Sequence, residues 1–336
     1  MATFVMQAMG CDVAALNTVQ FSNHTGYKQI KGTRFPAEHI RELYVGLQQS
    51  YLTDFDALLS GYAPSAEVVE AVGEIGQDLK KRAEGKPGSF FWVLDPVMGD
   101  QGRLYVKEDT VPAFKKIIGH ADLILPNQFE AEILSGIKID SLSTLTKAIT
   151  HLHRTHSIPH ILITSIRLPD TPTSTRPVLT VIGSTSKTDS TPRLFKIVIP
   201  ALDCFFSGTG DLFAALMLVR LREASAQARL LETQSWMPDD KIPGPDLPLA
   251  KAAEKVLASM HVVLEKTMIS RREEMRRKGY DDEKSHLAPG KDVDITQGEG
   301  KKWYLAETKA AEVKLVRNVR DLWEPEMRFK AEGVEI

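Results

Sequence analysis

The feature of the sequence that most constrains its fold is an alternation, through the first half of the chain, of short apolar runs with segments of helical spacing. The apolar runs are VAALNTV (13–19), ALLSGY (57–62), FFWVLDPVMGD (90–100), DLILPN (122–127) and HILITS (160–165). Short strands that alternate with helices favour a mostly parallel sheet whose faces are covered by helices. The sequence therefore predicts an α/β fold with a mostly parallel central sheet flanked by helices.

The predicted helices are segments in which apolar residues recur every three or four positions. They cover residues 36–51, 68–79, 128–136, 141–155, 212–221 and 249–269. After residue 167 the pattern changes. LPDTPTSTRP (168–177) predicts a loop, and VLTVIG and RLFKIVIP indicate a pair of antiparallel strands. We therefore expect a few antiparallel strands at one edge of the sheet.

By composition the chain divides into one α/β domain and two less regular stretches. We predict the domain over residues 1–270, with an Ala-, Gln- and Pro-rich stretch at about 222–248 as a mobile surface insertion. Residues 271–308 are charged and poor in apolar side chains, so we expect them to be disordered or to form a solvated helix end. Residues 309–336 are expected to complete the domain with a helix or strand.

Charge and cysteine content exclude several classes of protein. The formal net charge is −2, so no overall field would attract nucleic acid or an acidic membrane. Two distant cysteines, Cys11 and Cys204, do not make a disulfide framework, which fits a reducing compartment. No apolar run reaches the ~18 residues that cross a bilayer, and the N-terminus lacks a secretory pattern. We expect a cytoplasmic protein with no nucleic-acid or membrane partner.

The strongest local signal is GTGD (208–211), which lies between a strand region and an apolar helix. Glycines allow the backbone to turn closely around a ligand, and the free amides at a helix start favour an anion such as a phosphate. A carboxylate at Asp211 suits a base that takes a proton during phosphoryl transfer. The alternative is an aspartate N-cap after a glycine turn. No GxxxxGK[ST] sequence occurs, so the P-loop NTPase fold is unsupported.

Polar side chains follow three of the predicted strands. Asp95 and Asp100 end one run, and Asn127 and Glu130 lie just beyond the next. Because ligands bind outside the carboxyl ends of strands in open α/β sheets, these oxygens are candidate ligands for Mg²⁺. Turn formation accounts for them equally well. The hydroxyls that end 160–165 are candidates for hydrogen bonds to a nucleotide or for simple turn hydroxyls.

Six motifs occur along the chain: FSNHTGY (21–27), LLSGY (58–62), DPVMGD (95–100), PNQFEAEIL (126–134), ITS (163–165) and SGTGDLFAAL (207–216). Their order and spacing resemble those of the eukaryotic pyridoxal kinases, members of the ribokinase-like superfamily. The resemblance is close over residues 2–221 and resumes at 251–266. It implies a ribokinase-like fold and ATP-dependent phosphorylation of the 5′-hydroxymethyl group of pyridoxal, pyridoxine or pyridoxamine.

The resemblance also implies which residues act. Asp211 would contact the substrate and take the proton of its 5′-hydroxymethyl group, while Thr25 and Tyr62 would hold the pyridine ring. The anion hole for the transferred phosphoryl group is implied in the backbone amides of Gly208, Thr209 and Gly210. The implied ATP-binding residues are Asp100, Thr164, Ser165, Phe206, Ser207 and Leu264.

A Mg²⁺ ion is the implied cofactor. Asp100 would contact the ATP phosphates and the metal, and Glu130 would help through water, so both are candidate metal-binding residues. The resemblance leaves open whether a monovalent cation such as K⁺ is also required, and it implies a homodimer.

Two features depart from the family pattern. The family opens with a strand, a serine and a glycine-rich turn, whereas Met1–Phe4 already resembles the helix that follows them. We therefore expect a missing first strand, from a misassigned start, a truncated form or an impaired protein. Leu125 stands where threonine is common in the family. The alternatives are a hydroxymethylpyrimidine-type kinase and a truncated, catalytically impaired protein that binds a nucleotide or a partner.

His24 and the three histidines of HLHRTH (151–156) carry no site in our interpretation. His151, His153 and His156 do not converge, because residues two apart on a helix point to different sides, and we interpret all three as a solvated helix face. We interpret His24, within FSNHTGY, as a residue that shapes its loop rather than as a catalyst.

Overall fold

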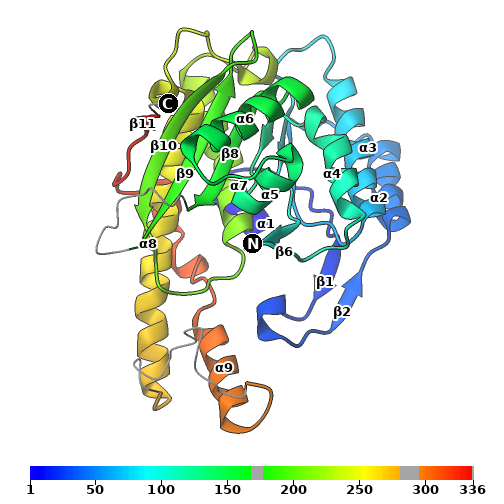
Figure 1. The fold of residues 1–336 in the computed structure, drawn as a ribbon. Helices are drawn as coiled ribbons and strands as arrows, with labels where there is room; N and C mark the ends of the chain where they lie inside the picture. The colour runs from blue at the N-terminus through cyan, green and yellow to red at the C-terminus, as the bar shows by residue number, and fades with distance from the viewer. Residues whose placement is uncertain (168–176, 281–294, 335–336) are drawn as a thin grey trace.

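A seven-stranded sheet forms the centre of the computed structural model, which describes residues 1–167, 177–280 and 295–334 (Figure 1). The strand order is β11-β10-β9-β8-β7-β4-β3. The four parallel strands are β3 (Ala57–Ser60), β4 (Phe91–Leu94), β7 (Leu123–Ile124) and β8 (His160–Ile166). The antiparallel strands are β9 (Val178–Ser186), β10 (Pro192–Pro200) and β11 (Glu332–Gly333). The predicted parallel sheet with antiparallel strands at one side is thus confirmed.

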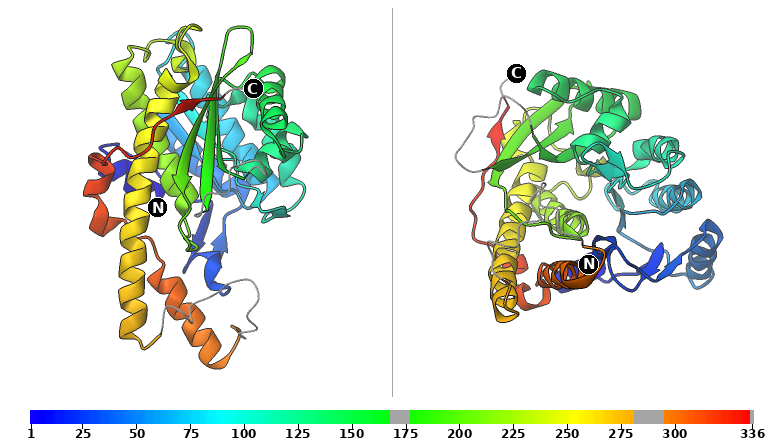
Figure 2. Two further views of the ribbon diagram at one scale, coloured as in Figure 1. Left: turned by 60° about the vertical axis from the view of Figure 1, so that its left-hand side comes forward. Right: turned by 60° about the horizontal axis from the view of Figure 1, so that its bottom comes forward.

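Helices cover both faces of this sheet (Figure 2). One face carries α2 (Ala37–Gln49), α3 (Ala66–Arg82), α4 (Thr110–Ile117), α5 (Gln128–Ser135) and α6 (Leu142–His156). The other carries α1 (Ala2–Ala8), α7 (Thr209–Gln227) and α8 (Pro248–Arg277). Both faces are apolar because successive strand residues point to opposite sides. On β4, Trp92 and Leu94 join the first core, and Phe91 and Val93 join the second.

Two short hairpins lie outside the main sheet. β1 (Val19–Phe21) and β2 (Gly32–Arg34) pair with each other, and the short 3₁₀ helix η1 (Thr25–Tyr27) lies between them in sequence. β5 (Gly99–Asp100) and β6 (Arg103–Leu104) form the second hairpin, directly after β4. Helix α9 (Gly298–Ala310) lies beside η1 at the lower end of the view in Figure 1. The remaining elements are η2 (Ile118–His120), η3 (Gln234–Trp236), η4 (Gly244–Asp246), η6 (Val316–Asn318) and α10 (Arg320–Trp323).

The predicted strand over 13–19 was wrong except at its last residue. Residues 11–17 have no regular secondary structure, and the strand begins at Val19. Among the described residues this strand pairs with β2, and most side chains of the pair reach solvent. The apolar composition of 13–19 had suggested a strand, but valine and alanine also occur in extended segments without regular pairing.

Residues 222–248, predicted as a mobile surface insertion, contain regular elements and a buried side chain. The first six of these residues continue α7, and η3 and η4 follow before α8 begins at Pro248. Trp236 is 2% exposed and stacks on Phe91, with ring centroids 3.9 Å apart. Its indole nitrogen donates a hydrogen bond of 2.9 Å to the Gly88 carbonyl. The proline-rich composition gave no indication that Trp236 is buried against Phe91.

The charged stretch 271–308 is largely helical where the structure describes it. Helix α8 continues to Arg277, and α9 begins at Gly298; residues 281–294 lie outside the described part of the chain. Residues 309–336, expected to complete the domain with a helix or strand, contain η6, α10 and the strand β11. The predicted loop at 168–177 lies outside the described residues except for Pro177.

His153 is buried, so the interpretation of three solvated histidines was wrong for this residue. It is 1% exposed, and its ring nitrogens hydrogen-bond to the Ile158 carbonyl at 2.6 Å and the Ser184 hydroxyl at 2.8 Å. Burial lowers the pKa of His153 to about 4. In the described ranges of the chain, no helix is both long and apolar enough to span a bilayer.

Candidate functional site

The GTGD turn starts α7 at the end of the sheet where the parallel strands finish. Gly208 is the N-cap and has a φ of 81°, in the left-handed region that glycine enters without strain. Thr209, Gly210 and Asp211 form the first helical turn, whose amide groups have no partner within the helix. The aspartate N-cap interpretation of Asp211 was therefore wrong, because the cap is three residues earlier. The turn leaves three backbone amides and one carboxylate together at a positive helix end.

Asp95 ends β4 directly beside this turn. A Cβ atom placed on Gly210 would lie 3.5 Å from Oδ2 of Asp95, so the helix start and the strand end are in close approach. Asp95 is buried, and burial together with the charges of Glu130 and Asp211 raises its pKa well above the usual range. Asp211 still reaches solvent, yet the protein around it raises the pKa of its carboxyl as well. A carboxyl with a raised pKa is a stronger base once ionised.

The β5–β6 hairpin presents Asp100 at the same edge of the sheet. The Asp100 carboxylate accepts a hydrogen bond of 2.8 Å from the amide of Gln101, whose φ is 48°. Gly99 permits this tight hairpin, since a Cβ there would lie 2.2 Å from the Arg103 carbonyl oxygen. Asn127 ties the hairpin to α5 by donating from Nδ2 to the Gly99 carbonyl at 2.7 Å. The hairpin therefore holds the Asp100 side chain half-buried near α5.

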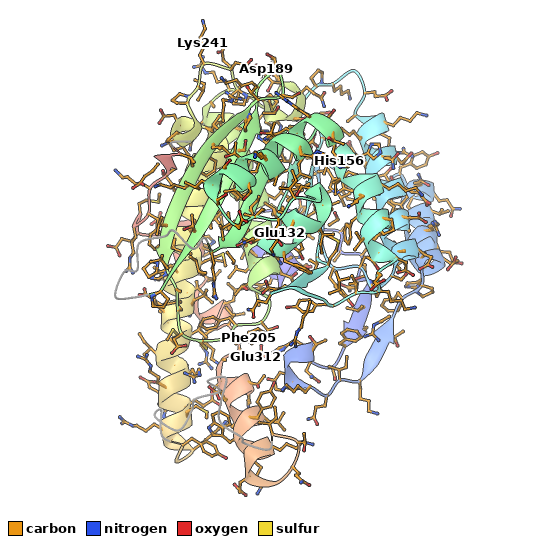
Figure 3. The ribbon with its side chains drawn as sticks, in the orientation of Figure 1. Glu132, His156, Asp189, Phe205, Lys241 and Glu312 are labelled. Atoms are coloured by element: carbon orange, nitrogen blue, oxygen red, sulfur yellow. The ribbon has the colours of Figure 1, made fainter. Side chains whose placement is uncertain are left out.

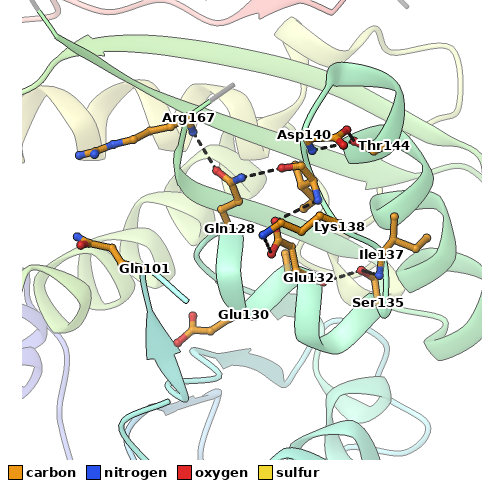
Figure 4. A network of polar contacts seen from close by, with 12 residues as sticks. Gln101, Gln128, Glu130, Glu132, Ser135, Ile137, Lys138, Asp140, Thr144 and Arg167 are labelled. Carbon is orange, nitrogen blue, oxygen red and sulfur yellow. Dashed lines mark hydrogen bonds and ion pairs between the residues drawn. The ribbon is translucent and has the colours of Figure 1, made fainter. Parts of the chain in front are cut away.

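Glu130 is the buried centre of this arrangement and points toward β5 in Figure 4. Its Oε1 accepts from the amides of Met98 at 2.9 Å and Gly99 at 3.3 Å, and its Oε2 accepts from the Asn127 amide at 2.9 Å. The last bond belongs to a capping box that begins α5. Burial raises the pKa of Glu130 to about 7, although the amide hydrogen bonds oppose this. These contacts make Glu130 an anchor of the β5 turn and leave Asp100 the more accessible of the two predicted metal-binding residues.

Within the described residues, no cluster of three or more His, Cys, Asp or Glu side chains has an arrangement that would hold a metal by itself. Mg²⁺ is commonly held by one or two carboxylates with the phosphates of its substrate completing the shell. The pair of Asp100 and Glu130 fits that second kind of site and does not fit a closed protein cage.

Thr164 and Ser165 lie at a break in the pairing of β8 with β9. The register shifts between Ile163 and Ile166, and Ser165 has a φ of 57°. The amide of Thr164 donates to the Pro126 carbonyl at 3.0 Å, which joins the ends of β7 and β8. Such a bulge turns side chains out of the regular pleat and is common beside active sites. Ser165 is exposed there, as a nucleotide contact requires.

A polar network supports this strand end on its α5 side (Figure 4). Gln128 accepts from the Arg167 amide at 3.0 Å and donates to the Ile139 carbonyl at 2.9 Å. Glu132 accepts from the Ile139 amide at 3.0 Å and pairs with Lys138. The network fixes the segment that leaves β8 against the start of α5.

The other predicted residues lie around this centre on separate elements. Phe206 and Ser207 are half-buried in the loop that leads into α7, and Leu264 is half-buried in the middle of α8. Tyr62 follows β3, and its carbonyl accepts a hydrogen bond of 2.8 Å from the Thr18 hydroxyl. Thr25 is exposed on η1.

The structure thus places Asp95 near both the GTGD turn and Glu130, whereas Thr25, Tyr62 and Leu264 lie on other elements. The ring of Phe205 lies 3.6 Å from the position of a Cβ on Gly26, so η1 does reach the loop before α7. Sequence reasoning had noted Asp95 only as one of several strand-end acids. Its signal was its position as the first acid of DPVMGD at the end of a wholly apolar strand.

Comparison with known proteins agrees with this architecture. The family model described as phosphomethylpyrimidine kinase matches residues 4–225. The chain is 38% identical to a putative pyridoxal kinase of Schizosaccharomyces pombe, with 79% of each chain covered. It is 35% identical to human pyridoxal kinase, with 80% of each chain covered.

Solved structures extend the likeness to nearly the whole chain. The structure resembles that of pyridoxal kinase from Leishmania donovani in complex with ADP and pyridoxamine, with a TM-score of 0.74 and 26% identity. That match covers 99% of this chain and 93% of the other. The chain therefore belongs to the pyridoxal kinases, within the phosphomethylpyrimidine kinase family.

Proposed function

We propose that this enzyme transfers the γ-phosphate of ATP to the 5′-hydroxymethyl group of pyridoxal, pyridoxine and pyridoxamine, with Asp211 as the base. The observation that carries the proposal is the first turn of α7, where one carboxylate lies next to the amides of Gly208, Thr209 and Gly210. A base and an anion site at the same helix end are what transfer to a hydroxyl group requires.

In the proposed reaction, the hydroxymethyl proton passes to the Asp211 carboxylate as its oxygen bonds to the γ-phosphorus. The bond from that phosphorus to the β–γ bridging oxygen breaks, and ADP leaves. The amides of the GTGD turn stabilise the negative oxygens of the phosphoryl group in transit. The raised pKa of Asp211 increases its strength as an acceptor of this proton.

The nucleotide binds, in this proposal, along the ends of β5 and β8. Asp100 would hold Mg²⁺, which neutralises the β- and γ-phosphates. Glu130 holds the turn that carries Asp100. Thr164 and Ser165 would contact the nucleotide at the β8 bulge, and the loop before α7, together with Leu264, would cover the adenine. Thr25 and Tyr62 would hold the pyridine ring on the opposite side.

The test is Asp211→Asn in the full chain. We expect kcat to fall on the order of 100- to 10,000-fold, while ATP binding, measured by calorimetry, persists because the nucleotide site keeps its groups. Asp203→Asn is a matched control, since Asp203 is an exposed acid in the loop before the same helix. Full activity of Asp211→Asn would refute the assignment of the base.

A second substrate class is favoured by the family description, which names phosphomethylpyrimidine kinase over residues 4–225. Pyridoxal and hydroxymethylpyrimidine should therefore be compared in one coupled assay. We expect the larger kcat/KM for pyridoxal, given the pyridoxal kinases among the relatives. From the same family resemblance, we propose a cytoplasmic homodimer. A monomer mass in sedimentation at micromolar concentration would refute the dimer.

A further inference from the structure

The segment that follows α8 contacts the η1 turn through the side chains of Tyr304 and Glu312. The Tyr304 hydroxyl donates a hydrogen bond to the Gly26 carbonyl. The Tyr27 hydroxyl donates to Oε1 of Glu312 at 3.0 Å, and the His24 Nε2 atom lies 3.3 Å from the same oxygen. We call Tyr304 and Glu312 the C-terminal clamp.

A cation–aromatic contact adds to the clamp. The Lys28 ammonium lies 5.1 Å from the centre of the Tyr304 ring, within the range of a favourable cation–π interaction. The C-terminal segment therefore contacts His24, Gly26, Tyr27 and Lys28. Thr25, between them, is exposed. In Figure 3, Glu312 and Phe205 are labelled close together between α9 and the start of α7.

Within the turn, His24 supports this arrangement. Its Nδ1 accepts a hydrogen bond of 3.1 Å from the Gly26 amide and so caps η1. When neutral with Nδ1 as acceptor, the ring carries its proton on Nε2, the atom that faces Glu312. The interpretation of His24 as a loop-shaping residue agrees with these contacts. Oε1 of Glu312 thus contacts both His24 and Tyr27, one at each end of the turn.

The clamp is itself anchored to the body of the enzyme. Arg271 of α8 and Glu307 of α9 form a buried ion pair. Beyond α9, the Lys314 amide donates to the Thr267 hydroxyl of α8 at 3.0 Å. Helix α8 packs along α7, the helix that begins with the GTGD turn. A continuous set of contacts therefore links the η1 turn to the helices around the site of transfer.

The η1 turn needs contacts with the C-terminal segment because it makes few contacts within its own hairpin. It is a single 3₁₀ turn between two strands of three residues, one half-buried and one exposed. Its local ties include a bond of 2.8 Å from the Ser22 amide to the Lys31 carbonyl and one of 2.7 Å from Asn23 Nδ2 to the Gln29 carbonyl. A loop that must be ordered when ligand binds lowers affinity, and pre-ordering it restores affinity.

We propose that Tyr304 and Glu312 are positioning residues that hold η1 so that Thr25 meets the pyridine ring of the substrate. The inference rests on the proposed function of Thr25. It assigns to the C-terminal segment a role in the affinity for the B6 vitamer and none in the affinity for ATP or in the chemical step.

The experiment compares Glu312→Ala, Glu312→Gln and Tyr304→Phe with the parent chain in steady-state kinetics. We expect the KM for pyridoxal to rise roughly 3- to 10-fold for each hydrogen bond removed, with kcat and the KM for ATP within about twofold of the parent. Glu312→Gln keeps an acceptor for Tyr27 and should fall between the parent and Glu312→Ala. Glu299→Ala is the matched control, because Glu299 is an exposed acid of α9 that pairs only with Lys302 among the described residues.

Two further measurements separate positioning of η1 from a general loss of stability. Amide hydrogen exchange should become faster in residues 24–28 of the clamp variants, while the exchange of α7 stays as in the parent. Tyr27→Phe should add no further rise in KM when combined with Glu312→Ala, because both changes remove the same bond. The parent's turnover of pyridoxal tests the proposed function by itself. If the parent lacked turnover, the dissociation constant for pyridoxal would replace KM in the same comparison.

The inference is overturned if Glu312→Ala and Tyr304→Phe both bind pyridoxal as the parent does. It is also overturned if kcat and both KM values change in proportion to a lowered melting temperature, because that pattern marks a merely structural contact. Either result leaves the assignment of Asp211 untouched.

Discussion

Ionisation of Glu130 should make the enzyme less stable as the pH rises toward neutrality. The pKa of this buried carboxyl is raised from its ordinary value of 4.5 to about 7. The folded protein therefore keeps a proton that the unfolded chain releases, and stability is lost as the pH rises from 4.5 through 7. At about 1.4 kcal/mol for each pH unit, the change in the free energy of unfolding is about 3 kcal/mol.

The assay compares urea unfolding of the parent and Glu130→Gln at pH 5, 6, 7 and 8. Glutamine also lacks part of the acceptor set used by Met98, Gly99 and Asn127, which lowers stability by an amount independent of pH. The difference between the two profiles therefore reports the titration of Glu130 together with its coupling to Asp95. It should shift in favour of the variant by about 2.5 kcal/mol between pH 5 and pH 8.

The comparison with Glu130→Gln is needed because other buried groups change the stability with pH in the opposite direction. Burial lowers the pKa values of His153 and His160 to about 4, so the protein loses stability through them as the pH falls below 6.5. The parent and the variant share that loss. If the two profiles run parallel from pH 5 to pH 8, the three amide hydrogen bonds outweigh the loss of hydration, and the reasoning is refuted.

Three other outcomes are expected. EDTA should abolish turnover and Mg²⁺ restore it, and Asp100→Ala should raise the Mg²⁺ needed for half-maximal rate about 10- to 100-fold; an altered affinity for pyridoxal alone would place Asp100 in the substrate pocket. Trp236→Ala should lower the free energy of unfolding by about 3–5 kcal/mol, because the indole fills a buried position against Phe91; unchanged urea unfolding would contradict this. His153→Phe should lower stability at pH 7 by about 2 kcal/mol through the loss of its bonds to Ile158 and Ser184, and a change below about 0.5 kcal/mol would count against it.

Much of the fold could be predicted because its signals are local. Strand β4 is apolar on every residue, as a strand buried on both faces must be. The start of α5 follows from a capping box of Asn127 and Glu130, three residues apart. The GTGD turn places a glycine N-cap, free helix amides and an acid within four residues, so one segment of sequence contains most of the proposed transfer centre.

The features that sequence could not supply depend on partners far along the chain. Trp236 is buried by Phe91, and nothing in the surrounding prolines indicates that contact. His153 follows the apolar positions of its helix closely, but its partner Ser184 lies on a strand in another part of the sequence. The approach of Asp95 to Gly210 likewise needs the topology, because only the fold brings the end of β4 to the start of α7.

Helix α7 is buried on nearly all sides from Leu212 to Leu221, between the sheet and α8. A helix packed in this way cannot shift by even a fraction of a turn without opening a cavity in the core. We therefore expect Asp211, the proposed base, and the amides at the first turn of α7 to keep their positions throughout the reaction cycle. Among the described elements, the β1–β2 and β5–β6 hairpins lie outside the main sheet, so we expect the movement that admits substrates and releases products to involve them. Turnover should accordingly respond to solvent viscosity through these hairpins, while the catalytic turn remains still.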